Sequence, residues 1–171
     1  MNAAHRIDLE RFVPFRLNRL AAEVSRALAR VYGERFGIDI PEWRVIATLG
    51  DCGRARAQDI ALSTRMHKSM VSRAVARLIE LGWVARSASA KDRREAPLRL
   101  TAAGHEVYQQ LVPIVLDYQD RLLASLSESE RRMLEQLLAK LERQLELHCR
   151  PMRPDARVRE AGAALPEPSQ G

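Results

Sequence analysis

The fold of this chain is decided by HKSMVSRAVARLIELGWV, residues 67–84, and by KDRREAPLRLTAAG, residues 91–104. In the first stretch an apolar stripe recurs at helical spacing, formed by Met70, Val71, Ala74, Leu78 and Leu81. This spacing predicts a helix that buries one face and ends at Gly82. The other side of the helix is polar and basic, and carries Lys68, Ser69, Ser72, Arg73 and Arg77.

After Gly82 the helical period gives way to two short runs, WVARSAS and APLRLT, with charged residues between them. Leu98 and Leu100 point to one side and Arg99 to the other, which is the alternation of a half-buried strand. Pro97 has no amide proton, so it must lie at a sheet edge or at the start of its strand. We therefore predict a β-hairpin directly after the basic helix.

Two helices are predicted immediately before the basic one. Residues 55–63, ARAQDIALS, give a short helix that pairs with it as a helix-turn-helix. Residues 39–49 start with Asp39 three positions before Glu42, which is the pattern of a capping box. We expect the helix that begins there to end at Gly50.

A long helix is predicted at each end of the folded region. From Leu9 onward apolar residues recur at steps of three and four until Gly33 and Gly37 interrupt them. After the hairpin, Thr101 can cap a helix whose apolar face is Val107, Leu111, Ile114, Tyr118 and Leu122, with a kink at Pro113.

Ser127 and Glu130 form a second capping box, which starts a last helix of about 22 residues, or ~33 Å. Such a helix is too long to be covered by so small a body. From residue 150 onward the sequence is rich in proline and poor in large apolar side chains, which predicts a disordered tail.

The positive charge of the chain is concentrated in one segment. Residues 54–94 hold ten basic and three acidic residues, a net charge of +7, whereas the formal charge of the whole chain is +6. The rest of the chain is therefore close to neutral. A local excess of this kind favours a polyanionic partner such as double-stranded DNA.

Other classes of site find no support in the sequence. Cys52 and Cys149 are far apart and have no zinc-site spacing, and the four histidines are dispersed, so we expect no metal, no cofactor and no catalytic site. The first residues lack the apolar core of a signal peptide, and no apolar run approaches the ~20 residues that span a bilayer. We expect a cytoplasmic protein without membrane contact.

Residues 9–147 resemble the multiple-antibiotic-resistance regulator (MarR) family. The most specific element of the resemblance is the wing signature, present here as Asp92, Arg94, Leu100, Thr101 and Gly104. The resemblance implies a mainly α fold with a small β-hairpin, a winged helix-turn-helix with long N- and C-terminal dimerisation helices. It divides the chain into residues 1–36 (dimerisation), 37–101 (DNA-binding lobe), 102–149 (dimerisation) and 150–171 (tail).

The expected function is sequence-specific binding of double-stranded DNA, usually for repression. The expected DNA-binding residues of the basic helix are Lys68, Ser69, Ser72, Arg73 and Arg77. Arg73 suits a bidentate contact to guanine, while Ser69 and Ser72 suit phosphates. At the hairpin tip Lys91, Arg93 and Arg94 can reach the adjacent minor groove, and the resemblance gives Asp92 the role of a brace for a neighbouring arginine. A homodimer would place two basic helices about 34 Å apart, so the expected operator is an inverted repeat.

Two positions depart from the usual pattern of the family. His67 stands where the family often has an acidic cap on the recognition helix, and Arg65 stands where the inter-helix turn often has glycine. The first change is expected to weaken the cap by ~1 kcal/mol, and the second to strain a left-handed position.

The resemblance also implies an effector, a small aromatic carboxylate or a thioester of one. Arg16 and Arg19 lie beside an apolar stripe, and Trp43 and Arg44 open the second helix, which we expect to face the same junction. A carboxylate ligand needs a fixed cation and an aromatic wall, and Arg16 resembles the arginine that supplies the cation. The alternative is that both arginines form surface or intersubunit ion pairs and that Trp43 is core. His67 could line this pocket, contact phosphate or cap the helix.

A different class of function remains open from the sequence. The basic face could bind an acidic protein, which would make the chain a helical interaction or adaptor protein. Salt-dependent preference for duplex DNA would separate the two hypotheses.

Overall fold

The computed structural model describes residues 6–87 and 96–145. It confirms the expected fold class, because its helices are accompanied by one small antiparallel sheet. The elements are α1 (Val13–Phe36), α2 (Ile40–Cys52), α3 (Ala57–Thr64), α4 (Lys68–Glu80), β1 (Val84–Arg86), β2 (Leu98–Leu100), α5 (Ala102–Leu122) and α6 (Glu128–Gln144). Within the described ranges no helix has the combination of length and hydropathy that a membrane span requires.

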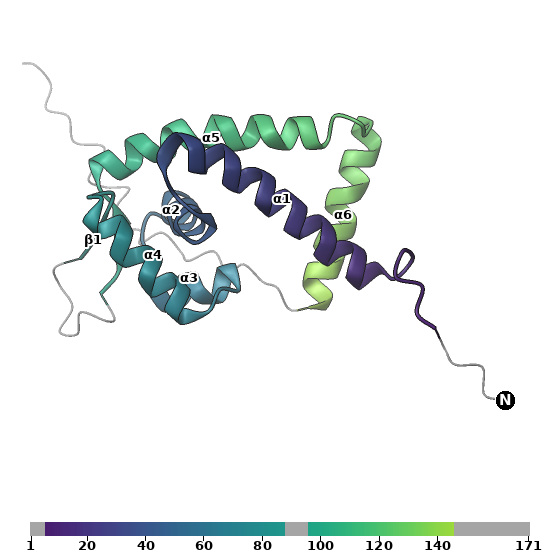
Figure 1. The fold of residues 1–171 in the computed structure, drawn as a ribbon, viewed down its shortest axis with the longest axis horizontal. Coiled ribbons are helices and arrows are strands. Elements are labelled where there is room, and N and C mark those ends of the chain that lie inside the picture. Colours follow the sequence, from purple (N-terminus) through teal and green to yellow (C-terminus); the bar gives the residue numbers. More distant parts are fainter. Residues whose placement is uncertain (1–5, 88–95, 146–171) are drawn as a thin grey trace, which may run out of the picture.

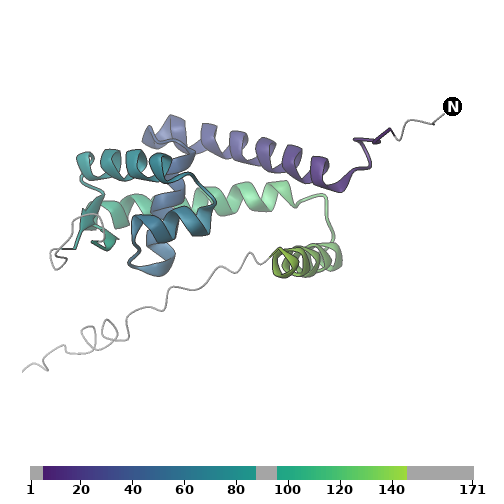
Figure 2. The same ribbon diagram turned by 90° about the horizontal axis from the view of Figure 1, so that it is seen from below.

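The two long helices α1 and α5 pack against each other and connect two ends of the molecule (Figure 1). At one end α2, α3, α4 and the β-strands form a small lobe. At the other end α6 crosses the direction of α5 and stands apart from the lobe, as the perpendicular view shows (Figure 2). The chain therefore separates a compact lobe from an extended helical part.

Helix α1 begins at Val13 and not at Leu9 as the sequence pattern suggested. Pro14 lies in its first turn, where a missing amide proton costs nothing, and residues 9–11 form a turn instead. Gly33 does not interrupt the helix. Helix α1 ends at Phe36, and Gly37 is its C-cap. Gly37 has φ 64°, and its amide donates to the carbonyl of Gly33 at 2.9 Å.

Helix α2 also runs further than expected, through Gly50 to Cys52. Gly50 sits within the helix because the ring of Tyr108 on α5 lies against it: a Cβ at this position would come 2.4 Å from the ring. The glycine therefore allows close packing of α5 on α2 and is not a stop signal. The turn comes at Gly53, with φ 73°.

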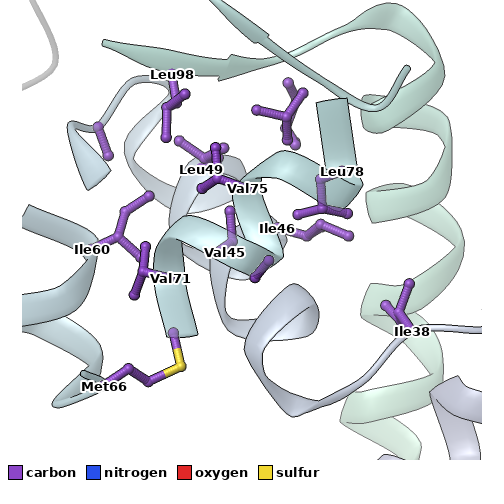
Figure 3. Close-up of a cluster of buried hydrophobic side chains, with 14 of the residues drawn as sticks. Ile38, Val45, Ile46, Leu49, Ile60, Met66, Val71, Val75, Leu78 and Leu98 are labelled. Atoms are coloured by element: carbon purple, nitrogen blue, oxygen red, sulfur yellow. The ribbon is translucent and has the colours of Figure 1, made fainter. Parts of the chain in front are cut away.

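The core lies inside the lobe, where α2, α3 and α4 meet the sheet (Figure 3). Its labelled members from α2, α3, α4 and β2 are Val45, Ile46, Leu49, Ile60, Val71, Val75, Leu78 and Leu98. The expected buried stripe of α4 was partly wrong: Met70 and Leu81 are 40% and 42% exposed, and Val75 is buried in their place. The buried face follows the i, i+3, i+4, i+7 pattern that starts at Val71, which leaves Met70 outside it.

The hairpin prediction is confirmed for its paired part. Val84 pairs with Leu100 and Arg86 with Leu98, and the two leucines are buried while Arg99 is exposed. Ala55 adds a bridge on the other side of Leu98, through backbone hydrogen bonds of 3.1 and 2.8 Å. The hairpin tip, residues 88–95, lies outside the described residues.

Both predicted caps after the hairpin are present. Thr101 Oγ1 accepts a hydrogen bond from the amide of Gly104 at 3.1 Å, and α5 then continues through Pro113 without ending. The amide of Ser127 donates to Glu130 Oε2 at 2.8 Å, and the Glu130 amide returns a bond to Ser127 Oγ at 3.4 Å. The Ser127 hydroxyl also donates to Glu130 Oε2, at 2.7 Å. This bond first, and the bond from the Ser127 amide second, lower the pKa of the Glu130 carboxyl because they favour its charged form.

Helix α6 is described for 17 residues, about 26 Å, and not for the expected 22. None of its residues is buried in the single chain. Its exposed large apolar residues are Met133, Leu137, Leu138 and Leu141, and the C-cap residue Leu145 is exposed as well. Residues from 146 on, including the expected tail, lie outside the described part.

Candidate nucleic-acid interface

The turn between α3 and α4 orients the basic helix. Arg65 adopts the left-handed conformation with φ 55° and ψ 28°, and within the described residues no other non-glycine residue has a positive φ. This confirms that the position where glycine would be usual is left-handed here. The next residue, Met66, is 8% exposed and points into the core, which holds the turn against the lobe (Figure 3).

His67 is the N-cap of α4. Its Nδ1 accepts a hydrogen bond from the amide of Ser69 at 3.3 Å and lies 2.8 Å from Ser69 Oγ. Of the three uses that the sequence left open for His67, capping is therefore the one that the structure displays. The imidazole replaces the acidic cap, so the first turn of α4 has an acceptor for one of its free amides.

Ser69 and Arg73 lie on the side of α4 opposite the core. At about 100° per residue they are nearly diametrically opposite the buried Val71, Ala74, Val75 and Leu78. Ser72 is exposed beside this face, and Lys68 is exposed in the first turn of the same helix. Together they form a polar, positively charged surface that the core holds from behind, and we call Lys68, Ser69, Ser72 and Arg73 the reading face.

Ala76 belongs to the same side and was not singled out from the sequence. It follows Arg73 by three positions and Ser69 by seven, and it is exposed. Its small side chain leaves room for a groove to approach the helix closely. The spacing of three from Arg73 and seven from Ser69 was the available signal in the sequence. Alanine carries no charge, so a pattern of basic residues does not include it.

Arg77 differs from the other basic residues of α4 because it is held by the protein. Its Nη2 donates to the carbonyl of Gly37 at 2.9 Å, and its Nε lies 4.0 Å from Glu42 Oε1. Glu42 is buried, and its other oxygen accepts the amide of Asp39 at 2.9 Å as the expected capping box requires. The side chain of Arg77 thus reaches back to the corner between α1 and α2.

The predicted wing residues Lys91, Asp92, Arg93 and Arg94 fall within residues 88–95, outside the described part. The strands on either side of this segment, β1 and β2, are paired with each other. The roles of these four residues therefore stay predictions.

Across the described ranges no group of histidine, cysteine or acidic side chains is arranged to hold a metal ion.

The residues expected to bind an effector fall into two separate places within one chain. Trp43 stacks on Tyr32 with 5.9 Å between ring centroids, and Arg44 Nη1 is 3.5 Å from the carbonyl of Thr64. Burial raises the pKa of Tyr32 to about 12, while the nearby Arg44 acts in the opposite direction. Arg16 precedes Tyr32 by sixteen positions on α1, or about 24 Å along the helix.

Arg19 accompanies Arg16 near the start of α1, where its guanidinium lies 5.9 Å from the centre of the Phe15 ring. A single chain therefore does not bring Arg16 or Arg19 to Trp43. A shallow hollow of about 380 Å³, which the sequence did not indicate, lies instead between α1 and α5. It is lined by Ala27, Arg30, Val31, Glu34, Tyr118 and Arg121.

The sequence relatives of this chain are regulators. The family model described as the MarR family matches residues 36–95, from the end of α1 to the segment that follows β1. The transcriptional regulator BilQ of Clostridium symbiosum is 27% identical over 115 residues, which cover 67% of this chain and 80% of BilQ. The transcriptional repressor IacR of Pseudomonas putida is 25% identical over 121 residues, covering 65% of this chain and 72% of IacR.

Solved structures agree with the sequence relatives. The crystal structure of a MarR/EmrR family transcriptional regulator from Acinetobacter sp. ADP1 matches with a TM-score of 0.74 and 27% identity, over 83% of this chain and 100% of that one. NadR, crystallised in complex with 4-hydroxyphenylacetate, shares the fold with a TM-score of 0.64 and 23% identity, over 82% of this chain and 96% of that one.

Proposed function

We propose that this chain is a repressor of the MarR family, the family whose model it matches, and that it binds an inverted-repeat operator as a homodimer. Its family and relatives are regulators of transcription and not enzymes. The observation that carries the proposal is the reading face: Ser69 and Arg73 project from α4 opposite a core that fixes the helix. A helix presented in this way suits the major groove of DNA.

The contacts that we propose follow from the chemistry of each side chain. Arg73 donates two hydrogen bonds to a guanine edge, whereas Lys68, Ser69 and Ser72 contact phosphates. Lys91, Arg93 and Arg94 of the wing reach the flanking minor groove, with Asp92 as the brace of a neighbouring arginine. The residues between 37 and 101 thus form the DNA-binding lobe.

The homodimer would be formed by the helices outside this lobe, in residues 1–36 and 102–149. Support comes from the apolar side chains that one chain leaves exposed near the start of α1 and along α6: Val13, Leu17, Leu20, Leu137, Leu138 and Leu141. Covering these side chains gives a favourable hydrophobic contribution that a single chain does not obtain.

Substitution of Arg73 tests the proposed reading role. Arg73→Ala should weaken operator binding by about 5- to 150-fold, equivalent to ~1 to 3 kcal/mol, and relax sequence preference at one base pair of each half-site. Titration of duplexes that carry single substitutions measures both effects. Arg132→Ala, which removes an exposed arginine from α6, is the matched control and should leave binding unchanged. Wild-type affinity and preference in Arg73→Ala would remove Arg73 from the reading role.

We further propose that a small aromatic carboxylate or a thioester of one releases the repressor from DNA. The Tyr32–Trp43 stack offers an aromatic wall, and Arg44 lies close enough to Tyr32 to affect its pKa. Arg16 and Arg19 could complete this site only from the partner subunit, since their own chain holds them far from Trp43. His67, at the start of α4 in the same lobe, would be a further contact for the effector. NadR, which has the same fold, binds an aromatic acid of this class.

The effector proposal is tested by adding 4-hydroxyphenylacetate, benzoate and a hydroxycinnamoyl thioester to the protein–DNA complex. Release by one of them that Arg16→Ala or Arg44→Ala weakens, and Arg30→Ala does not, supports the proposed site. The reverse pattern would place the site in the hollow between α1 and α5. No release by any of the compounds would contradict the proposed class of effector.

A further inference from the structure

Arg77 connects three elements that would otherwise meet only through apolar packing. It starts from α4, donates to the carbonyl of Gly37 at the end of α1, and approaches Glu42 in the first turn of α2. Gly37 lies forty positions before Arg77 in sequence, so the contact is a long-range one. The recognition helix is thus attached by a side chain to the corner from which the long helix α1 departs.

The chemistry of the corner suits an arginine. The last carbonyls of α1 have no partner within the helix and lie at its negative end, which favours a cation. Glu42 is buried, and the Asp39 amide occupies one of its oxygens, so the second oxygen has Arg77 as its nearby positive charge. A guanidinium can serve both acceptors because its donors form a rigid fork.

We infer that Arg77 is a positioning residue for DNA recognition, which fixes the angle of α4 to α1, and that it does not contact the DNA itself. The inference rests on the proposed function, in which α1 belongs to the dimer interface and α4 to the reading surface. It reassigns Arg77, whose side chain is 55% exposed but whose guanidinium donates a hydrogen bond to another element of the fold.

A fixed angle matters because an inverted repeat is read by two helices at once. Their separation must match one helical turn of DNA, ~34 Å, so the link between each α4 and the dimer helices sets which half-site spacing is accepted. Without Arg77, α4 would still be held by Val71, Val75 and Leu78 of the core. Its orientation relative to α1 would be less strictly set.

Operators with altered spacing separate a positioning residue from a phosphate contact. The probes are the duplex that wild-type protein protects in its own upstream DNA and versions with one base pair inserted or removed at its centre. For Arg77→Ala we expect the preference for the native spacing to fall about three- to tenfold, while the salt dependence of native-operator binding stays as in wild type. A phosphate contact predicts the opposite: equal loss at every spacing, and a salt slope reduced by about 1.

Glu42→Gln provides an independent variant, since an amide oxygen can still accept the Asp39 amide while the charge facing Arg77 is removed. The double variant Arg77→Ala/Glu42→Gln should lose little more spacing preference than Arg77→Ala alone, because both changes act on one contact. Additive losses would overturn the inference, and if Arg77→Ala does not fold, unchanged spacing preference in Glu42→Gln would overturn it as well. Failure of the wild-type protein to bind any inverted repeat would instead overturn the proposed function.

Discussion

Gly104 shows how a single residue joins the two parts of the molecule. It lies in the first turn of α5, and its amide donates to Thr101 Oγ1, which itself donates to the carbonyl of Gly82 at 2.6 Å. A Cβ at Gly104 would stand 2.0 Å from the carbonyl oxygen of Trp83, which is backbone and cannot turn away. The close contact between the hairpin and α5 therefore requires glycine at this position.

The substitution Gly104→Ala should accordingly lower the free energy of unfolding by about 1 to 3 kcal/mol, because the backbone must shift to admit a methyl group. Urea denaturation followed by circular dichroism measures this change. The matched control is Gly33→Ala in α1, where a Cβ would meet only Ile38 O at 3.6 Å. There the better helix propensity of alanine should raise stability by up to ~1 kcal/mol. Equal effects of the two substitutions would refute the packing argument.

Single residues also mark the limit of what the sequence predicts. The alternation at Leu98, Arg99 and Leu100 and the cap at Thr101 follow from local patterns and were predicted. The left-handed Arg65 was predicted from the family resemblance, which implies glycine at that turn. The partner of Arg77 could not be predicted, because a carbonyl forty positions away leaves no local pattern. Gly50 was taken for a stop because the ring that packs on it comes from another helix.

At the scale of elements, the sequence indicated each helix correctly but placed some ends wrongly. Start signals were reliable where a side chain caps the helix, as at Thr101 and Ser127, since the cap and its acceptor lie within one turn. The start of α1 was misplaced because apolar periodicity continues into a turn before Pro14. The stripe of α4 shifted from Met70 to Val75, since several apolar residues could form a face and only packing selects among them.

Helix α6 carries the prediction for the dimer. It buries none of its residues in the single chain, and Leu138 and Leu141 are exposed on one side. We expect the protein to have the mass of a dimer, and Leu138→Lys/Leu141→Lys to reduce it to a monomer, because the interface would have to bury two charges. Light scattering coupled to size-exclusion chromatography measures the mass.

A lysine on the opposite side of α6 gives the control for this prediction. Gln136→Lys adds the same charge to the same helix, about half a turn away from the leucine face, and should leave the mass unchanged. A monomeric wild-type protein would contradict the prediction. So would a double variant that keeps the mass of a dimer.

At the scale of the whole molecule, the positions of the reading face and of the exposed leucines explain why we propose an inverted-repeat operator. The reading face lies on the lobe at one end of α1 and α5, and the exposed leucines lie toward the other end (Figure 1). Two such chains joined through their long helices carry two reading faces at a fixed separation, so the DNA they recognise must repeat with the same symmetry. In the proposed complex, the charge excess in residues 54–94 would supply the general attraction to DNA, and the geometry would supply the selection.

The central claim is tested most directly by hydroxyl-radical footprinting of the full-length protein on the DNA upstream of its own gene. We predict two protected patches related by two-fold symmetry and centred about 10 base pairs apart, which disappear as salt is raised. A single patch, or no protection at a protein concentration that saturates binding for relatives of this family, would contradict the account.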